Sequence, residues 1–235
     1  AIQQMTAEAA ERYDFDGWLI QNYAYAKGKG GDFARYMDTM PGAGYDRFLQ
    51  DSVTAAVSDA VSTIKDVRRN LYVGLMAHGV WAHSSANENG SQTSGAYQSL
   101  YDGHADTRKW LENGLFDFVL VDNGNSTTHS TASFGKVFDW WTSFCEQIEL
   151  PLYINHASHK ACGSEQGWRS PDQLAQQVLA CKKSDAWQGS VFSSYAALAK
   201  DTEGSTRALL GAFGGTLNEQ YISRKLVFTT PTQTT

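Results

Sequence analysis

Five short apolar runs alternate along the chain with longer amphipathic segments, and this order limits the fold more than any other feature. The apolar runs cover residues 15–20, 71–76, 116–121, 150–154 and 189–193. Helical patterns cover residues 6–13, 45–66, 102–113, 132–148, 171–183 and 207–213. Runs that are apolar almost throughout predict strands buried on both faces, and the helices between them predict parallel pairing. We therefore expect an α/β fold, either an open doubly wound sheet or a (β/α) barrel.

Local signals support the predicted helices. In residues 45–66 the apolar side chains recur every three to five positions and form one stripe, made of Phe48, Val53, Val57, Val61 and Ile64. Ser170 followed by Pro171 is typical of a helix start, with serine as the N-cap and proline at the first position. Gly114 follows residues 102–113 and is typical of a helix end.

Length and charge exclude several classes of protein. The chain has 235 residues, close to the length of about 250 that one complete barrel needs. Its net charge is −6 and it has no run of Lys or Arg, so we expect no nucleic-acid partner. It also has no stretch of about 18 apolar residues, which excludes a membrane-spanning helix.

No cofactor is expected either. The dinucleotide-binding pattern G-x-G-x-x-G follows none of the predicted strands. Residues 28–31 are rich in glycine, but they follow a polar loop rather than the end of a strand. The pattern G-x-S-x-G of a nucleophilic serine is absent as well.

The cysteine and histidine spacings do not predict a metal site. Cys145, Cys162 and Cys181 show no C-x-x-C spacing, which disfavours a zinc site, and Cys162 and Cys181 are either free thiols or one disulfide. His156 and His159 lie in a loop rather than on one helix face, and no metal motif surrounds them. We therefore expect no metal ion.

Polar and aromatic residues gather where the predicted strands end, which is where active sites lie in parallel α/β folds. Amides both donate to and accept from hydroxyl groups, and aromatic faces suit the C–H faces of sugar rings, so this composition predicts a polysaccharide or other glycan ligand. The candidate substrate-binding residues are Gln21, Asn22, Tyr23, Tyr25, His78, Trp81, Asn123, His156 and Tyr195. Carboxylates are scarce at these positions, and Asp122 is the candidate catalytic residue.

Six sequence blocks, in order, resemble the glycosyl-hydrolase-like 10 family, whose members include bacterial cell-envelope glycosidases. They are YDFDGWLIQNYAY, LYVGLMAHGVW, YQSLYDGHADTRKWLENGLFDFVLVDN, LPLYINHASHK, GWRSPDQLAQQV and GSVFSSYAAL. The resemblance runs from about residue 6 to about residue 213. It implies the later part of a TIM-like barrel, a glycan substrate, and a secreted or cell-envelope location.

The resemblance also implies how the chain is divided. It makes residues 1–213 the barrel portion, while the sequence of residues 214–235 itself predicts a strand and a Thr-rich linker that leads to a further domain. In this alignment residues 15–20 are about the fourth barrel strand, so three earlier β-α units lie outside the chain. Five strands alone leave an open sheet edge, so we expect another chain or segment to complete the barrel.

The departures from the family pattern divide the functional prediction in two. The family has paired acids after its strand, and this chain has Gln21 and Asn22 there, which cannot exchange protons as acids do. The family has Pro-Gln where this chain has Val121-Asp122, so a carboxylate stands at a different strand end. One hypothesis is a glycosidase with Asp122 as acid or base, partnered by Glu88, Glu165 or a residue of the missing strands. The other is a catalytically inactive module that binds glycan or serves as a scaffold.

Overall fold

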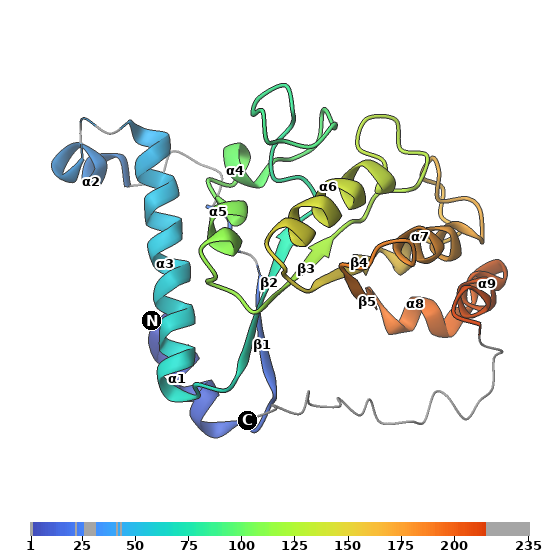
Figure 1. Cartoon of the computed structure of the whole chain (residues 1–235), viewed down its shortest axis with the longest axis horizontal. Helices are drawn as coiled ribbons and strands as arrows, with labels where there is room; N and C mark the ends of the chain where they lie inside the picture. The colour runs from blue at the N-terminus through green and yellow to red at the C-terminus, as the bar shows by residue number, and fades with distance from the viewer. Residues whose placement is uncertain (1, 22, 26–31, 41, 43, 215–235) are drawn as a thin grey trace.

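The computed structural model describes residues 2–21, 23–25, 32–40, 42 and 44–214. Asn22 and the predicted strand and linker in residues 215–235 lie outside the described part of the chain. Five parallel strands form one sheet, and helices flank it (Figure 1). The strands are β1 Gly17–Ile20, β2 Tyr72–His78, β3 Phe118–Asp122, β4 Leu152–His156 and β5 Trp187–Phe192.

The strand order distinguishes the two expected architectures. Each strand pairs with the next one along the chain, in the order β1-β2-β3-β4-β5, and every pair is parallel. A doubly wound sheet reverses its direction at a switch point, whereas a (β/α) barrel adds each strand on the same side as the last. The fold is therefore a portion of a TIM-like (β/α) barrel, as the sequence predicts, and not an open doubly wound sheet.

Most of the predicted helices form, with some shifts in their ends. The α-helices are α1 Ile2–Arg12, α2 Asp32–Thr39, α3 Tyr45–Val67, α4 Ser99–Asp102, α5 Thr107–Glu112, α6 Phe134–Gln147, α7 Gln173–Cys181, α8 Tyr195–Lys200 and α9 Ser205–Ala212. Two short 3₁₀ helices are η1 Ser158–Lys160 and η2 Thr202–Gly204. The sequence patterns did not predict α2 or α8.

Two predicted helix starts are wrong in detail. The predicted helix 102–113 forms only from Thr107 onward, as α5, because His104 adopts a left-handed conformation with φ of 51° after α4 ends at Asp102. Asp106 then caps α5 by accepting a hydrogen bond from the Lys109 backbone. Ser170 does not cap α7, which begins at Gln173; its Oγ accepts from the Asp172 backbone at 3.2 Å, within the turn before the helix.

The main core lies between one face of the sheet and the covering helices. Alternate residues of the central strands point into it, among them Val73, Leu75, Val121 and Ile154, all fully buried. The predicted stripe of α3 packs against this core from Val53 to Ile64. Burial of each such side chain contributes about 1.5–3 kcal/mol to folding, so this face holds the strands in place.

The other face of the sheet is the one that would line the inside of a closed barrel. Here Tyr72 and Val191 are 47% and 42% exposed. Phe118 and Tyr153 are half-buried on the same face, with ring centroids 5.6 Å apart in an edge-to-face arrangement. This exposed apolar surface is what an incomplete ring of barrel strands leaves open.

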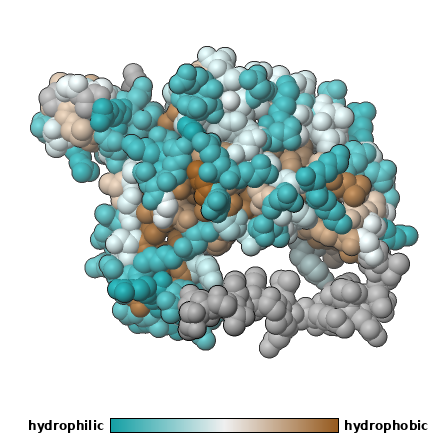
Figure 2. Space-filling view, viewed as in Figure 1, coloured by the Kyte–Doolittle hydropathy of each residue, from teal (hydrophilic) through white to brown (hydrophobic). Residues whose placement is uncertain are grey.

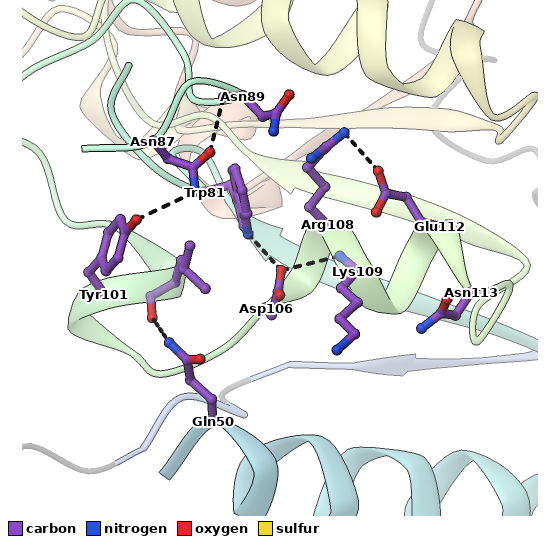
Figure 3. A pocket seen from close by; sticks show the side chains of 11 residues that line it. Gln50, Trp81, Asn87, Asn89, Tyr101, Asp106, Arg108, Lys109, Glu112 and Asn113 are labelled. Carbon is purple, nitrogen blue, oxygen red and sulfur yellow. Dashed lines mark hydrogen bonds and ion pairs between the residues drawn. The ribbon is translucent and has the colours of Figure 1, made fainter. Parts of the chain in front are cut away.

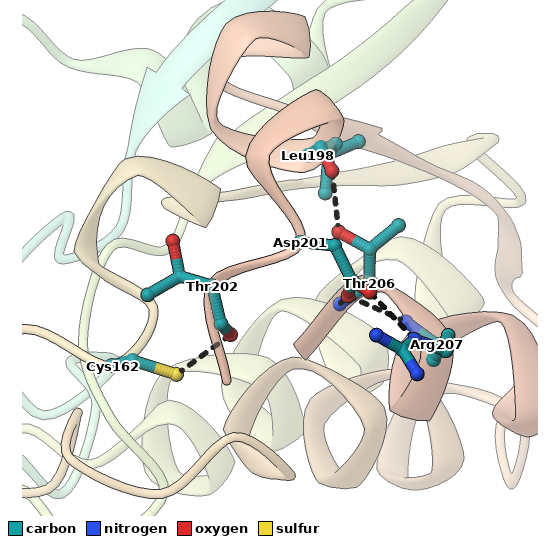
Figure 4. Close-up of polar contacts among 6 residues, drawn as sticks. All are labelled: Cys162, Leu198, Asp201, Thr202, Thr206 and Arg207. Atoms are coloured by element: carbon teal, nitrogen blue, oxygen red, sulfur yellow. Dashed lines mark hydrogen bonds and ion pairs between the residues drawn. The ribbon is translucent and has the colours of Figure 1, made fainter. Parts of the chain in front are cut away.

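No helix in the described part of the chain is long and apolar enough to cross a membrane. The surface seen in Figure 2 is largely hydrophilic, with apolar patches between the helices. The three cysteines are free thiols, so the alternative of a Cys162–Cys181 disulfide is wrong for this structure. Cys181 is buried on α7 in the core, whereas the Cys162 thiol donates to the Thr202 carbonyl at 3.2 Å (Figure 4).

Candidate functional site

Three polar residues lie side by side at the carboxyl ends of the central strands. The register pairs His78 of β2 with Asp122 of β3, and Asp122 with Asn155 of β4. The neighbours before them, Ala77, Val121 and Ile154, face the helix core. Because side chains alternate along a strand, the three polar residues point toward the opposite face, the inner side of the barrel.

Hydrogen bonds extend this row to Ser193, directly after β5. Asn155 Nδ2 donates to Asp122 Oδ1 at 2.9 Å, and Ser193 Oγ donates to Asn155 Oδ1 at 2.8 Å. A carboxylate only accepts, so the Asn155 amide must present its nitrogen to Asp122 and its oxygen to Ser193. The residues His78, Asp122, Asn155 and Ser193 are called the site cluster below. The amide holds Asp122 in one orientation, and Oδ2 has no hydrogen bond to another described residue.

His78 supplies an uncharged imidazole next to the carboxylate. Burial lowers its pKa from 6.5, and the nearby Asp122 carboxylate partly opposes that shift. Two tyrosine rings flank it edge-on, with centroid distances of 5.0 Å to Tyr97 and 6.3 Å to Tyr23. At neutral pH the ring is therefore neutral and offers one donor and one acceptor to a ligand.

Tyr23 adds a phenol that keeps its proton. Its hydroxyl is buried, and burial raises its pKa, more than the His78 backbone lowers it. Its ring packs against Trp110 of α5 at a centroid distance of 5.3 Å. Burial raises the pKa of Tyr97 as well, and the Asp102 carboxylate adds to that shift. The site cluster thus contains one neutral imidazole and lies beside two protonated phenols.

Two candidates from the strand ends point the other way, into the helix layer. His156 is fully buried, with Nδ1 at 2.8 Å from Gln177 Oε1 and Nε2 at 2.8 Å from Ser190 Oγ. Asn123 is also buried and donates from Nδ2 to the Phe134 carbonyl at 3.0 Å. Both side chains tie the sheet to its covering elements, and the structure does not bring them to the surface at the strand ends.

Three aromatic candidates form no hydrogen bond or ring contact with a described residue of the site cluster. Trp81 is 4% exposed, stacks on Trp140, and donates from Nε1 to Asp106 Oδ1 at 3.1 Å. The Tyr25 hydroxyl donates to the Asp32 carboxylate. Tyr195 begins α8 and is 68% exposed.

The last candidate, Gln21, lies at the edge of the sheet. It is exposed directly after β1, where the alternation of the strand turns it toward the inner face. Its neighbour Asn22 lies outside the described residues. Gln21, Tyr23, His78 and Asp122 are therefore the sequence-predicted residues that end near the carboxyl edge of β1–β3.

Neither acid proposed as a partner for Asp122 is bonded to the site cluster. Glu88 lies exposed in the loop between β2 and α4. Glu165 forms an ion pair with Lys160 at 3.0 Å, and its side chain is 60% exposed. Asp122 is the only carboxylate among the last residues of the five described strands. Among the described residues, no three His, Cys, Asp or Glu side chains are grouped as metal ligands would be.

The predicted strand 150–154 ends just before Asn155, but neither Asn155 nor Tyr97 is among the candidates chosen from the sequence. Asn155 contacts both Asp122 and Ser193, and Tyr97 packs edge-on against His78. The available signal was the register: a residue one place before His156 faces the opposite side of β4 from it. Tyr97 comes from the loop between β2 and α4, where no periodicity marks its direction.

The comparison with known protein families shows which family the chain belongs to. The family model described as "Glycosyl hydrolase-like 10" matches residues 1–168, which include β1 to β4 and three residues of the site cluster. The chain belongs to the glycosyl hydrolase-like 10 family. Family membership agrees with the barrel order of the strands, and it covers the segment that holds Gln21, His78, Asp122 and Asn155.

Two curated relatives are longer than this chain. It is 26% identical over 204 residues to glycosyl hydrolase YngK of Bacillus subtilis, a match that covers 84% of this chain and 40% of that protein. It is 29% identical over 166 residues to glycosyl hydrolase DigH of Escherichia coli, covering 68% of this chain and 37% of that protein. The chain thus spans well under half the length of these two relatives.

Two solved structures show distant similarity. The catalytic domain of β-amylase from Paenibacillus polymyxa aligns with a TM-score of 0.44 and 10% identity, over 94% of this chain and 51% of that chain. The xylanase 10B modules of Clostridium thermocellum align with a TM-score of 0.42 and 13% identity, over 81% of this chain and 37% of that chain.

Proposed function

We propose that this glycosyl hydrolase-like domain binds a polysaccharide at the carboxyl ends of its strands, across the site cluster. The observation that supports this most is the hydrogen-bonded row Ser193–Asn155–Asp122. It fixes the carboxylate while leaving Oδ2 without a bond to another described residue, so that oxygen accepts from a ligand hydroxyl. A fixed acceptor of this kind is strong because a hydrogen bond to a charged group is worth more than a neutral one.

The surroundings of Asp122 suit a hydroxyl-rich ligand. The neutral imidazole of His78 and the amide of Gln21 both donate and accept, as sugar hydroxyls require. The ring of Tyr153 lies half-buried on the same face of the sheet, two residues before Asn155 on β4. Aromatic and amide groups around one charged acceptor are typical of a site that orients a sugar without relying on charge alone.

Hydrolysis is the second candidate function, and Asp122 is the observation that favours it. Glycoside hydrolysis uses two carboxyl groups, about 5 to 10 Å apart, on opposite sides of the bond that is cut. The described strand ends supply one, and the family's paired acids are replaced by Gln21 and Asn22. A hydrolytic site would therefore take its second carboxylate from outside these five strands.

The exposed inner face suggests where that second group would come from. Tyr72, Phe118, Tyr153 and Val191 leave apolar surface open on the side that faces the barrel interior. We propose that a further segment or chain with three β-α units covers this face and closes the barrel. We also propose a secreted or cell-envelope location, where polysaccharides are accessible.

Co-sedimentation with insoluble polysaccharides tests the proposed function. The chain would be mixed with bacterial cell-wall glycan, chitin and cellulose, and the bound fraction measured for the parent and for Asp122→Asn. The asparagine keeps the shape but removes the charge, so we expect at least about a tenfold loss of affinity on the glycan that binds. Asp185→Asn, in an exposed loop before β5, is the matched control and should bind as the parent does.

Release of reducing sugar from the same glycans separates binding from cleavage. If the parent releases sugar and Asp122→Asn binds without releasing any, the domain is a hydrolase. If the parent binds but releases none, it is a binding domain. Absence of binding to all three glycans, or equal binding by the parent and Asp122→Asn, would overturn the proposed site.

A further inference from the structure

A hollow in the helix layer is lined by none of the residues of the site cluster. Its volume is about 640 Å³, within the range of about 300–1,000 Å³ that is typical of small-ligand sites. It lies between α3, α4, α5 and the loop that follows β2 (Figure 3). The lining residues are Gln50, Trp81, Asn87, Asn89, Leu100, Tyr101, Asp106, Arg108, Lys109, Glu112 and Asn113, which define the α3–α5 pocket.

The charged side chains of this pocket balance one another. Arg108 and Glu112 form an ion pair at 2.8 Å, and the guanidinium lies over the Trp81 ring at 5.5 Å. Asp106 and Lys109 carry the two remaining charges, which are opposite in sign, and neither forms an ion pair with another described residue. The pocket therefore has no net charge, and its electrostatics favour neither an anionic nor a cationic ligand.

Amide side chains supply the uncommitted hydrogen-bonding groups of the pocket. Those of Asn89 and Asn113 form no hydrogen bond with another described residue, although the Asn89 backbone carbonyl accepts from Trp140 Nε1 at 2.8 Å. Gln50 makes a long contact of 3.4 Å from Nε2 to the Leu100 carbonyl, and its Oε1 accepts from no other described residue. The three amides stand on different sides of the hollow in Figure 3. An amide both donates and accepts, as a sugar hydroxyl does, so this set suits a hydroxyl-rich ligand.

Tyr101 provides an aromatic surface at the edge of the pocket. Its hydroxyl donates to the Ala86 carbonyl at 3.1 Å and lies 3.4 Å from Asn87 Nδ2. The residue is 41% exposed, so its ring is accessible while its hydroxyl is held. The negative face of such a ring attracts the C–H groups of a sugar. Trp81, by contrast, is buried in the inner wall, where it donates to Asp106 at 3.1 Å.

We propose that the α3–α5 pocket is a second carbohydrate site, which binds a neutral oligosaccharide. Tyr101 stacks on one sugar ring, and the three uncommitted amides bind hydroxyl groups around it. The balance of charges disfavours a uronic-acid oligosaccharide or a phosphate, and the mostly polar lining disfavours an apolar ligand. The site would hold the domain on a neutral polysaccharide independently of the strand ends, and two sites on one polymer bind it more tightly than either alone.

Calorimetric titration with cellohexaose and chitohexaose, two neutral oligosaccharides, tests this site. Both are titrated into Asp122→Asn, so that binding at the strand ends is weakened and the remaining binding reports on the pocket. At least one of them should bind, and Asn113→Ala added to this variant should weaken that binding about fivefold. Asn70→Ala, an exposed asparagine in the turn before β2, is the matched control and should have no effect.

Two substitutions of Tyr101 test the aromatic contact in the same Asp122→Asn variant. Tyr101→Ala removes the ring and should weaken binding about tenfold, whereas Tyr101→Phe keeps the ring and should bind almost as before. Tyr13→Ala, an exposed tyrosine directly after α1, is the matched control. A thermal melt of each variant establishes that it is folded.

A charged ligand tests the claim of neutrality, and hexagalacturonate serves as that probe. It should bind more weakly than the neutral oligosaccharide. The proposal is overturned if neither neutral oligosaccharide binds, if Asn113→Ala and Tyr101→Ala both bind as Asp122→Asn alone does, or if hexagalacturonate binds equally well. The proposed function fails by a different result, because equal polysaccharide binding by the parent and Asp122→Asn would leave the losses caused by Asn113→Ala and Tyr101→Ala in place.

Discussion

Asn155 donates from Nδ2 to Asp122 Oδ1 at 2.9 Å, and Ser193 holds the other end of the same amide at 2.8 Å. The carboxylate at the end of β3 therefore takes its direction from β4 and from the loop after β5. A side chain that orients a ligand-binding carboxylate contributes to affinity without touching the ligand. Its removal should therefore weaken ligand binding.

Asn155→Ala should weaken polysaccharide binding by about tenfold and lower the free energy of unfolding by about 1–2 kcal/mol. It removes the donor to Asp122 and leaves the Ser193 hydroxyl without its acceptor. Co-sedimentation and urea denaturation measure the two effects. Asn70→Ala, in the exposed turn before β2, serves as the control. Unchanged binding by a folded Asn155→Ala variant would show that the orientation of Asp122 does not matter.

His156 should make the fold less stable as the pH falls from about 6.5 to about 4. Burial lowers its pKa from 6.5 to about 4. The unfolded chain therefore takes up a proton in this window while the folded chain does not, and the free energy of unfolding falls by about 3 kcal/mol in all. Above pH 6.5 the ring is neutral in both the folded and the unfolded chain, and the full stabilisation of about 3 kcal/mol is present.

Urea denaturation of the parent and of His156→Gln across pH 4 to 8 measures this contribution. Acidic groups titrate in both proteins, so the difference between the two curves isolates His156. The difference in the free energy of unfolding between the two proteins should change with pH between 4 and 6.5 and be constant above pH 6.5. A pH-independent difference for His156→Gln would contradict the assignment of a buried neutral ring.

The strands could be predicted from the sequence more reliably than the directions of their side chains. All five apolar runs became strands because a short run that is apolar almost throughout is distinct from the helical periodicity around it. The same property conceals which face each residue takes. Asn155 and His156 are adjacent and polar, and only the register shows that Asn155 meets Asp122 while His156 lies between Phe134 and Phe192.

Helix α2, which the sequence patterns did not predict, depends on tertiary contacts. α2 is eight residues long, and its one buried residue, Tyr36, packs against Tyr45 and Phe48 of α3. Short helices gain little from intrinsic propensity, so packing decides whether they form. The break between α4 and α5 was equally hard to predict, because the local sequence pattern does not indicate the left-handed conformation of His104.

Gly90→Ala should lower the free energy of unfolding by about 1–3 kcal/mol, because the new methyl group has no room. A Cβ at Gly90 would lie 2.5 Å from the carbonyl carbon and oxygen of His83. These atoms belong to the backbone, which is held there by the bridge between His83 and Ser91. Gly135→Ala, on α6 with open space around it, is the control and should leave stability unchanged or raise it by up to about 1 kcal/mol. Equal stability of the two variants in urea denaturation would contradict this packing.

Thiol labelling should distinguish Cys162 from the two buried cysteines. Cys162 is half-buried on a loop, whereas Cys145 and Cys181 are fully buried, and burial raises the pKa of each buried thiol to about 12. Burial and the Glu203 carboxylate raise the pKa of Cys162 as well, so accessibility makes the difference. The native protein should react with one equivalent of a chromogenic disulfide reagent at pH 8 in a phase that is rapid relative to the two buried thiols. All three thiols should react in denaturant without a reductant, since none is in a disulfide. In Cys162→Ser the rapid native phase should disappear, while Cys181→Ser should retain it. Only one reactive thiol in denaturant would instead show that two of the cysteines are paired.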